Sequence, residues 1–252
     1  TLQPARLSGL AGCLLEKEVA MTRLPLVLIP GMMCDARLYG PQIAAFSGSR
    51  ALHLAPICNE DNVEALAAAI LSGAPQRFAL AGLSMGGIVA MEVVRQAPER
   101  VERLALLDTN PRAELDTVKE KRAPQMAVVR AGGLSDVMRL EVIPNFAHDR
   151  STAADLESLA LDMAEGLGPE VFLRQSKALI DRPSQTETLR AYKGKALVLT
   201  GESDRLCPLD RHTQMAELLQ NSVLEIIEQA GHLTTLEQPA ATNAALGRWL
   251  ED

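Results

Sequence analysis

The sequence predicts an α/β fold, built on a mostly parallel sheet of about six strands with helices on both faces. From residue 24 onward, short apolar runs alternate with segments whose apolar residues recur at helical spacing, as in strands joined by crossover helices. The runs are apolar at nearly every position, which is typical of strands covered on both faces. With 252 residues, 47% of them hydrophobic, the chain is long enough to bury a sizeable core.

The expected strands are six apolar runs, and four amphipathic segments are expected to be helices. The strands are residues 24–31, 51–56, 77–84, 101–110, 196–201 and 222–232. The helices are residues 62–74, 86–99, 208–220 and 237–251. We assign these elements to one core, made of residues 21–110 and 196–252.

Residues 111–195 interrupt this alternation, because they contain several helical stretches and no convincing strand. We expect a helical insertion there, after the fourth strand. Residues 1–20 are expected to be a leader or a misassigned start before Met21. The letters "LAGC" within them match the end of a lipoprotein signal, but the apolar run of about nine residues is short for a signal core.

The formal net charge is −7, which argues against nucleic acid or an anionic membrane as a partner, because either would favour a basic face. No stretch approaches the roughly 20 apolar residues of a membrane-spanning helix. The four cysteines, Cys13, Cys34, Cys58 and Cys207, show neither metal-type nor paired spacing, which indicates a reducing compartment. We expect a cytoplasmic protein without a metal site that acts on a small molecule. Its oligomeric state stays open.

The stretch "AGLSMGG" places Ser84 between Gly82 and Gly86, directly after an apolar run and at the start of an expected helix. A serine in a G-x-S-x-G pattern on such a strand-to-helix turn exposes its hydroxyl as a nucleophile. The glycines let the chain turn tightly, and the helix N-terminus supplies positive potential. The alternative is a helix-capping serine in a glycine-rich turn.

A serine hydroxyl needs a base to remove its proton, and the chain has four histidines. His53 falls in an expected strand, His148 in the insertion and His212 in a helix. His232 follows the last strand in a loop, and loops at the carboxyl ends of parallel strands are where sites form. We therefore predict that His232 is the base.

The imidazole needs an anion to hold its tautomer and stabilise its protonated form. Asp204, in "TGESDRLCP" after the fifth strand, is the predicted acid. Its rivals are Glu202 nearby and Asp108 at the end of the fourth strand, whereas Asp210 is expected to be a helix N-terminal charge.

A tetrahedral oxyanion requires backbone donors, normally the N–H after the nucleophile and one from the loop after an early strand. Met85 supplies the first of these. The second is expected from Met32 in "LIPGMMCD", where Gly31 allows close backbone approach.

Four stretches in this order then carry a family resemblance: "LVLIPGMM", "ALAGLSMGGIVAMEVVRQAPERVERLALLDT", "ALVLTGESDRLCP" and "EQAGHLTTLEQP". Over nearly all residues from 24 to 250, the chain resembles a serine hydrolase of the α/β-hydrolase fold. The resemblance implies a triad of Ser84, Asp204 and His232, oxyanion donors at Met32 and Met85, and no cofactor. It also implies that the helical insertion, residues 111–195, is a lid.

The chain is most similar in character to small carboxylesterases, enol-lactonases and carrier-protein methyl ester esterases, and "SMGG" also occurs in cofactor-free haloperoxidases and carbon-carbon bond hydrolases. Many members read His-Gly where this chain has Pro30 and Gly31. Many also begin with an antiparallel hairpin, but too few strand-like residues precede Leu24. We therefore expect about six strands without that hairpin.

Serine at position 84 predicts acyl transfer to water, because relatives of this fold that dehalogenate haloalkanes use aspartate and dienelactone hydrolases use cysteine. We predict a serine esterase acting on small to medium, largely apolar esters. A lactonase or carbon-carbon bond hydrolase on the same triad, an acyltransferase and a non-catalytic ligand receptor remain alternatives.

The substrate pocket is expected to be apolar and adaptable, although each residue assigned to it could instead pack in the core. These residues are Met33, Cys34, Met126, Phe146 and Met163. Four arginines of the insertion and its surroundings could meet an acidic substrate, but we expect them on solvated helix faces. They are Arg112, Arg130, Arg139 and Arg174.

Overall fold

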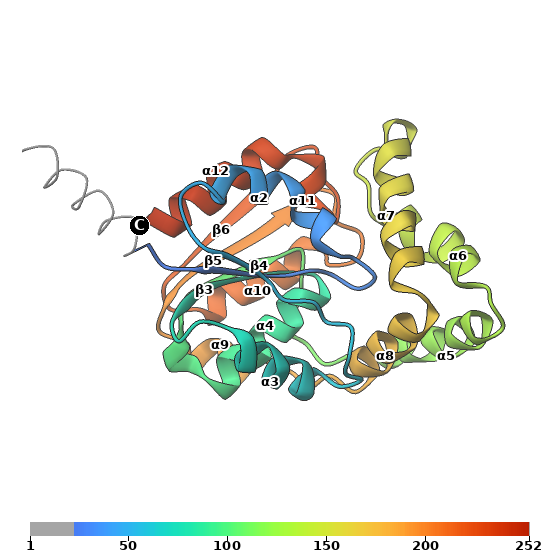
Figure 1. Ribbon diagram of the computed structural model, residues 1–252, viewed down its shortest axis with the longest axis horizontal. Helices are drawn as coiled ribbons and strands as arrows, with labels where there is room; N and C mark the ends of the chain where they lie inside the picture. The colour runs from blue at the N-terminus through green and yellow to red at the C-terminus, as the bar shows by residue number, and fades with distance from the viewer. Residues whose placement is uncertain (1–22, 252) are drawn as a thin grey trace, which may run out of the picture.

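The computed structural model describes residues 23–251, and it contains the predicted parallel sheet (Figure 1). Six strands lie in the order β2-β1-β3-β4-β5-β6, and every neighbouring pair is parallel. The strands are β1 (Leu26–Ile29), β2 (Leu52–Leu54), β3 (Phe78–Leu83), β4 (Val101–Leu107), β5 (Lys195–Gly201) and β6 (Ser222–Ile227). The predicted α/β fold is confirmed; residues 1–20, expected to be a leader, lie outside the described part.

The centre of the sheet is buried on both faces because its strands are apolar there: β1 and β3 carry no polar side chain, and residues 104–107 of β4 and 196–199 of β5 are all apolar. In β1, Leu26 and Leu28 belong to one core cluster, whereas Val27 and Ile29 belong to the other. This alternation follows from the two-residue period of a strand, which points successive side chains to opposite faces. The continuous apolar runs therefore supply two cores at once.

Two layers of helices cover the faces of the sheet (Figure 1). One layer packs on the Leu26 side: η1 (Ala36–Tyr39), α2 (Gly40–Phe46), α11 (Thr234–Glu237) and α12 (Pro239–Glu251). The other packs on the Val27 side: α3 (Val63–Gly73), α4 (Met85–Gln96), η2 (Pro98–Arg100), α9 (Thr186–Ala191) and α10 (Leu209–Leu218). The predicted helices 62–74, 86–99, 208–220 and 237–251 correspond to α3, α4, α10 and α11 with α12.

Most strands are shorter than their apolar runs suggest. The first two runs predicted strands 24–31 and 51–56, but β1 spans Leu26–Ile29 and β2 spans Leu52–Leu54. The fourth and sixth runs predicted strands 101–110 and 222–232, but β4 ends at Leu107 and β6 at Ile227. Asp108 has φ 48° and Gln229 has φ 54°, in the left-handed region that turns the chain out of the extended conformation. The residues beyond each turn therefore form loops at the carboxyl edge of the sheet.

Residues 108–194, which we call the helical segment, contain helices and no strand. The elements besides α9 are α5 (Asp116–Arg130), α6 (Leu134–Val137), η3 (Met138–Val142), η4 (Ile143–Asn145), η5 (Arg150–Thr152), α7 (Ala154–Leu167) and α8 (Pro169–Ile180). The helices labelled α5, α6, α7 and α8 lie together at one side of the sheet in Figure 1, whereas α9 packs with α4 on the Val27 side of the sheet.

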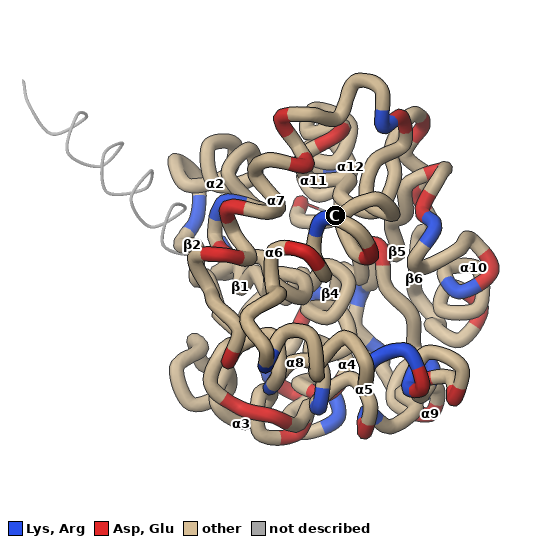
Figure 2. Tube along the Cα trace, turned by 90° about the vertical axis from the view of Figure 1, so that its right-hand side faces the viewer, with Lys and Arg blue, Asp and Glu red and all other residues tan. Residues whose placement is uncertain are grey.

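Acidic and basic residues are interspersed along the chain in the view of Figure 2. Within residues 23–251, every helix is too short or too polar to cross a membrane.

The turn between β3 and α4 brings the backbones of three elements into contact. A Cβ atom on Gly82 would overlap the backbone of Gly86, and a Cβ atom on Gly86 would overlap the carbonyl groups of Ile29 and Pro30. Glycine is therefore required at both positions by close approach rather than by its own dihedral angles. The turn rests directly against the end of β1.

We predict that Gly86→Ala destabilises the protein by about 3 kcal/mol, because the added methyl group must displace the backbone of β1. The matched control is Gly247→Ala in α12, where an added Cβ atom meets nothing within 4 Å and should stabilise by up to about 1 kcal/mol. Urea unfolding of both variants tests this. Equal stabilities would contradict the proposed close packing.

Candidate active site

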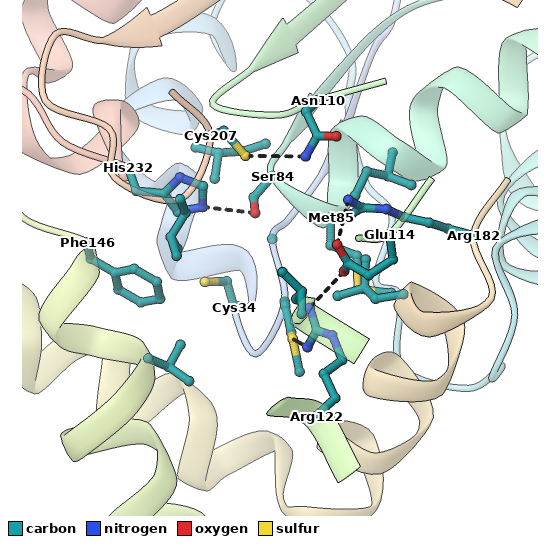
Figure 3. A pocket seen from close by; sticks show the side chains of 18 of the residues that line it. Cys34, Ser84, Met85, Asn110, Glu114, Arg122, Phe146, Arg182, Cys207 and His232 are labelled. Carbon is teal, nitrogen blue, oxygen red and sulfur yellow. Dashed lines mark hydrogen bonds and ion pairs between the residues drawn. The ribbon is translucent and has the colours of Figure 1, made fainter. Parts of the chain in front are cut away.

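Ser84 lies on a strained turn between β3 and α4. Its φ of 55° and ψ of −119° are rare for a residue with a side chain, and such strain costs of order 1–3 kcal/mol. The turn is held by its own hydrogen bonds: the N–H of Ser84 donates to the carbonyl of Leu107 at 2.9 Å, and its carbonyl accepts from the Thr109 hydroxyl at 2.7 Å. The conformation points the Ser84 side chain into a cavity (Figure 3).

His232 connects Ser84 to a carboxylate. Its Nε2 lies 2.9 Å from Ser84 Oγ, and its Nδ1 lies 2.9 Å from both carboxylate oxygens of Asp204. An ionised carboxylate only accepts, so Nδ1 carries the proton and Nε2 is free to accept from the serine hydroxyl. The three residues predicted as a triad are therefore joined by one chain of hydrogen bonds.

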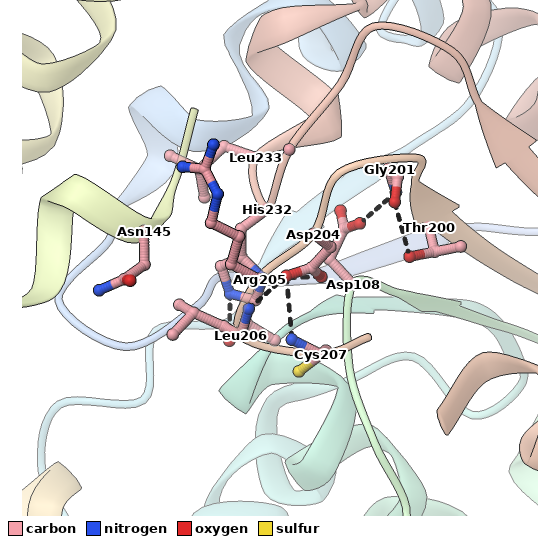
Figure 4. A network of polar contacts seen from close by, with 12 residues as sticks. Asp108, Asn145, Thr200, Gly201, Asp204, Arg205, Leu206, Cys207, His232 and Leu233 are labelled. Carbon is pink, nitrogen blue, oxygen red and sulfur yellow. Dashed lines mark hydrogen bonds and ion pairs between the residues drawn. The ribbon is translucent and has the colours of Figure 1, made fainter. Parts of the chain in front are cut away.

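The loop after β5 holds Asp204 in place. Asp204 Oδ1 also accepts from the N–H groups of Leu206 and Cys207, each at 2.9 Å (Figure 4). Burial alone would raise the pKa of Asp204, but the His232 charge and these hydrogen bonds outweigh it and lower the pKa. The side chain therefore stays ionised beside the imidazole.

Charge and burial act in opposite directions on His232. Its side chain is 2% exposed, and this burial would lower its pKa. The charge of Asp204 and its hydrogen bond outweigh burial, so the pKa of His232 lies above its usual 6.5. Asp204 thus stabilises the protonated imidazole.

Asp108, the rival acid in the sequence, faces different partners. Its Oδ1 accepts from the N–H of Gly201 at 2.9 Å and its Oδ2 from the Thr234 hydroxyl at 2.6 Å. Burial and the nearby charge of Asp204 raise its pKa well above the usual range. Asp108 therefore ties β4 to β5 and to the His232 loop, while Asp204 contacts the imidazole.

The backbone N–H groups of Met85 and Met32 donate to no acceptor among the described residues. Met85 lies at the first turn of α4 and Met32 in the loop after β1, and both residues line the cavity together with Ser84. A Cβ atom on Gly31 would lie 3.5 Å from the Cβ of Ser84, so this loop passes directly beside the serine. The arrangement matches the donor pair expected of an oxyanion hole.

The loop after β1 is fixed by a residue that the sequence did not single out. The N–H of Met33 donates to Gln175 Oε1 at 2.9 Å, and Gln175 Nε2 donates to the carbonyl of Ile57 at 2.9 Å. Gln175 is fully buried in α8. A glutamine on a helix carries no sequence signal for this role, because its partners are distant in the chain.

His212 supports the nucleophile turn from the far side. Its Nε2 accepts from the N–H of Thr109 at 3.0 Å, and the Thr109 hydroxyl in turn donates to Ser84. The ring is fully buried, and burial lowers its pKa from 6.5 to about 4. His212 is therefore a neutral structural histidine, in agreement with its predicted place in a helix.

The helical segment reaches the site through Phe146. Its ring stacks on the His232 ring with centroids 5.8 Å apart, and its carbonyl accepts from the N–H of His232 at 2.6 Å. A second contact joins the segment to the loop that carries Asp204: His148 Nδ1 lies 2.8 Å from the Oγ of Ser203. The segment therefore holds the loops of both His232 and Asp204.

The cavity above Ser84 has a volume of about 270 Å³ and is mainly apolar. Of the residues expected to line it, Cys34 and Phe146 do, together with Met32, Met85 and His232. Met33, Met126 and Met163 lie outside the lining and pack in the core. Met163 is fully buried, and its sulfur accepts from the N–H of Asp35, so its apolar character reflects packing between α7 and the loop after β1.

Asp204, Cys207 and His232 have ligand atoms within 4.8 Å of one another. Their contacts do not fit a metal ion. Burial, aided by the charge of Asp204, raises the pKa of the Cys207 thiol well above its usual value, whereas a metal ligand must be the thiolate. The carboxylate already accepts from the imidazole and two backbone N–H groups.

We predict that folding stability falls as pH drops because of His212. Its pKa of about 4 in the folded protein lies below the unfolded value of 6.5, so the unfolded chain binds the extra proton as pH falls through this range. Between about pH 7 and pH 5, the free energy of unfolding of the wild-type protein should fall by about 2 kcal/mol more than that of the His212→Gln variant. Urea unfolding measures this, and equal slopes with pH would contradict it.

The chain is similar to known proteins over most of its length. The model of the alpha/beta hydrolase family matches residues 26–245. A 2-hydroxymuconate semialdehyde hydrolase from Pseudomonas putida is 29% identical over 64% of this chain and 58% of its own length. A pimeloyl-[acyl-carrier protein] methyl ester esterase from Aromatoleum aromaticum is 24% identical over 84% of this chain and 86% of that protein.

Among solved structures, a thermophilic esterase from Thermogutta terrifontis is 27% identical, with a TM-score of 0.82 over 90% of this chain and 89% of that one. The chain spans only about three fifths of the length of the first curated relatives, 60% and 58%. The family match nevertheless covers most of the chain, from the first strand of the sheet into its last helix. This chain belongs to the alpha/beta hydrolase family.

Proposed function

We propose that this protein hydrolyses carboxylic esters through an acyl-enzyme formed on Ser84. The observation that carries the proposal is the hydrogen-bond chain from Ser84 Oγ through His232 to Asp204. Met32 and Met85, whose N–H groups are the proposed oxyanion donors, line the same cavity. A nucleophile, a base, an orienting acid and a pair of donors are the parts that acyl transfer needs.

In the first half of the reaction, Ser84 Oγ attacks the ester carbonyl while His232 Nε2 takes the hydroxyl proton. The carbonyl oxygen becomes negative and accepts from the N–H groups of Met32 and Met85, each worth about 3 kcal/mol of the barrier. The bond to the alkoxy group then breaks, and the protonated imidazole gives its proton to the departing alcohol.

In the second half, water attacks the acyl-enzyme and gives a proton to His232. The tetrahedral intermediate collapses, the proton passes to Ser84 Oγ, and the carboxylic acid leaves. Asp204 stays ionised throughout and holds the imidazole tautomer. This cycle needs no cofactor beyond the chain itself.

The relatives support an ester substrate in two cases. The esterase from Thermogutta terrifontis shares the fold at 27% identity, and the methyl ester esterase from Aromatoleum aromaticum aligns over most of both chains. The mainly apolar cavity favours an ester of small to medium size. The helical segment, which covers this cavity, is proposed to act as a lid.

We predict that Ser84→Ala lowers kcat for p-nitrophenyl hexanoate at least about a thousandfold, because no acyl-enzyme can form. Asp204→Asn should lower kcat about ten-thousandfold by stabilising the wrong imidazole tautomer. The matched control is Asp108→Asn, another buried aspartate. Its raised pKa already favours a neutral side chain, so activity should stay within about tenfold.

Initial rates of nitrophenol release measure all three variants. If Asp108→Asn lowered kcat as much as Asp204→Asn does, Asp108 rather than Asp204 would be the acid. Full activity in Ser84→Ala would refute the acyl-enzyme on this residue.

The dependence of kcat/KM on pH should follow the protonation of His232. Only the neutral imidazole accepts the serine proton, so kcat/KM should fall as pH drops through the His232 pKa, with its midpoint above 6.5. Asp210→Asn changes an exposed carboxyl on α10 and should leave the midpoint in place. A wild-type midpoint below 6.5 would mean that burial, rather than the charge of Asp204, dominates the pKa of His232.

A further inference from the structure

The cavity above Ser84 contains a second polar group, built from three charged residues of the helical segment. Glu114 Oε2 lies 3.3 Å from Arg122 Nη2, and Glu114 Oε1 lies 3.1 Å from Arg182 Nη2. The side chains of Glu114, Arg122 and Arg182 are 6%, 15% and 7% exposed. We call these three residues the arginine cluster. All of them line the same cavity as Ser84 and His232.

The arginine cluster has one positive charge in excess, because two guanidinium groups share one carboxylate. Each guanidinium has five N–H donors. The Nε atoms of Arg122 and Arg182 are buried without an acceptor among the described residues. One carboxylate neutralises only one of the two buried guanidinium groups, and an uncompensated buried charge is costly, so the cluster favours the binding of an anion.

The cluster contacts the loop that passes beside Ser84. Arg122 Nη1 is 3.7 Å from the sulfur of Met32, a residue that lines the cavity together with Ser84. In the view of Figure 3, Ser84 stands between His232 on one side and the arginine cluster on the other. A bound molecule that places its ester at Ser84 can therefore reach the cluster from the side opposite the base.

The pKa values of the two arginines show that Glu114 does not fully compensate their charge. Burial lowers the pKa of Arg122, and the charge of Arg182 acts in the same direction. Burial also lowers the pKa of Arg182. Glu114 opposes the shift in both, but it only partly offsets it.

We propose that the substrate carries a free carboxylate, bound by Arg122 and Arg182 while its ester carbonyl lies at Ser84. A carboxylate fits the excess of one positive charge, whereas a phosphate monoester carries about two negative charges at neutral pH. Its planar pair of oxygens also matches the donors of a guanidinium group. The proposal rests on the proposed ester hydrolysis and narrows it to half-esters of dicarboxylic acids and related acidic esters.

A purely structural role is the competing explanation, in which the cluster only ties α5 to the loop after α8. That role predicts no preference between acidic and neutral substrates. The proposed subsite predicts such a preference, and it predicts that the preference depends on the charge at position 122.

The kinetic test compares p-nitrophenyl hydrogen adipate with p-nitrophenyl hexanoate, which has the same acyl chain length without the carboxylate. Wild-type kcat/KM should be at least about tenfold higher for the acidic ester, as for a charge-assisted hydrogen bond. In Arg122→Gln this ratio should fall at least about tenfold, and Arg122→Lys should keep part of it. The control is Arg130→Gln, an exposed arginine on the same helix, which should keep the wild-type ratio.

A binding test separates failure of this proposal from failure of the proposed function. On Ser84→Ala, which cannot turn over, calorimetry should show tighter binding of monomethyl adipate than of dimethyl adipate, by at least about tenfold. The preference should disappear when Arg122→Gln is added.

If neither nitrophenyl ester is hydrolysed but monomethyl adipate is preferred, the proposed function fails and the anion subsite stands. Equal wild-type rates on both nitrophenyl esters, or equal binding of the two adipates, would overturn the subsite. Either result needs only wild-type or Ser84→Ala protein, so a misfolded Arg122 variant does not leave the proposal untested.

Discussion

The close approach of the β3–α4 turn to the end of β1 is the constraint on which the rest of this site depends. Because Gly86 packs directly on the carbonyl groups of Ile29 and Pro30, the loop after β1 passes beside Ser84. Ser84 itself is held at φ 55°, a conformation that one residue can hold only inside a rigid frame. Ser84, Met32 and Met85 consequently line one cavity.

Two buried carboxyl groups, those of Asp204 and Asp108, lie near the single imidazole of His232. Asp204 is kept ionised by His232 and by backbone N–H groups, while burial and the neighbouring charge raise the pKa of Asp108. Two like charges so close in a low-dielectric interior would repel strongly. The repulsion is avoided because hydrogen-bond donors and His232 favour the charged form of Asp204, whereas Asp108 has a structural role and a raised pKa. Only Asp204 is in contact with the imidazole.

The sheet and the helical segment have different tasks in this arrangement. Loops at the carboxyl edge of the sheet supply Ser84, Asp204 and His232, which we propose carry out the chemistry. The helical segment supplies Phe146 and the arginine cluster, which shape and charge the cavity. Because Phe146 also contacts His232 directly, a change in the segment that alters substrate choice can also alter the position of the base. Chemistry and specificity are thus physically coupled.

The sequence by itself determined the approximate positions of the strands and helices, because continuous apolar runs and a helical period of 3.6 are local signals. It placed Ser84, because the glycine pattern around it is local too, and it predicted His232 as the base and Asp204 as the acid from their places after strands. Only the tertiary structure supplied the distances to the imidazole, which put Asp204 rather than its rival Asp108 in contact with it. It likewise placed Met33, Met126 and Met163 in the core. The contact of Glu114 with Arg182, 68 residues apart, has no sequence signal, because a charged residue in a loop looks the same whether it faces solvent or a buried cavity.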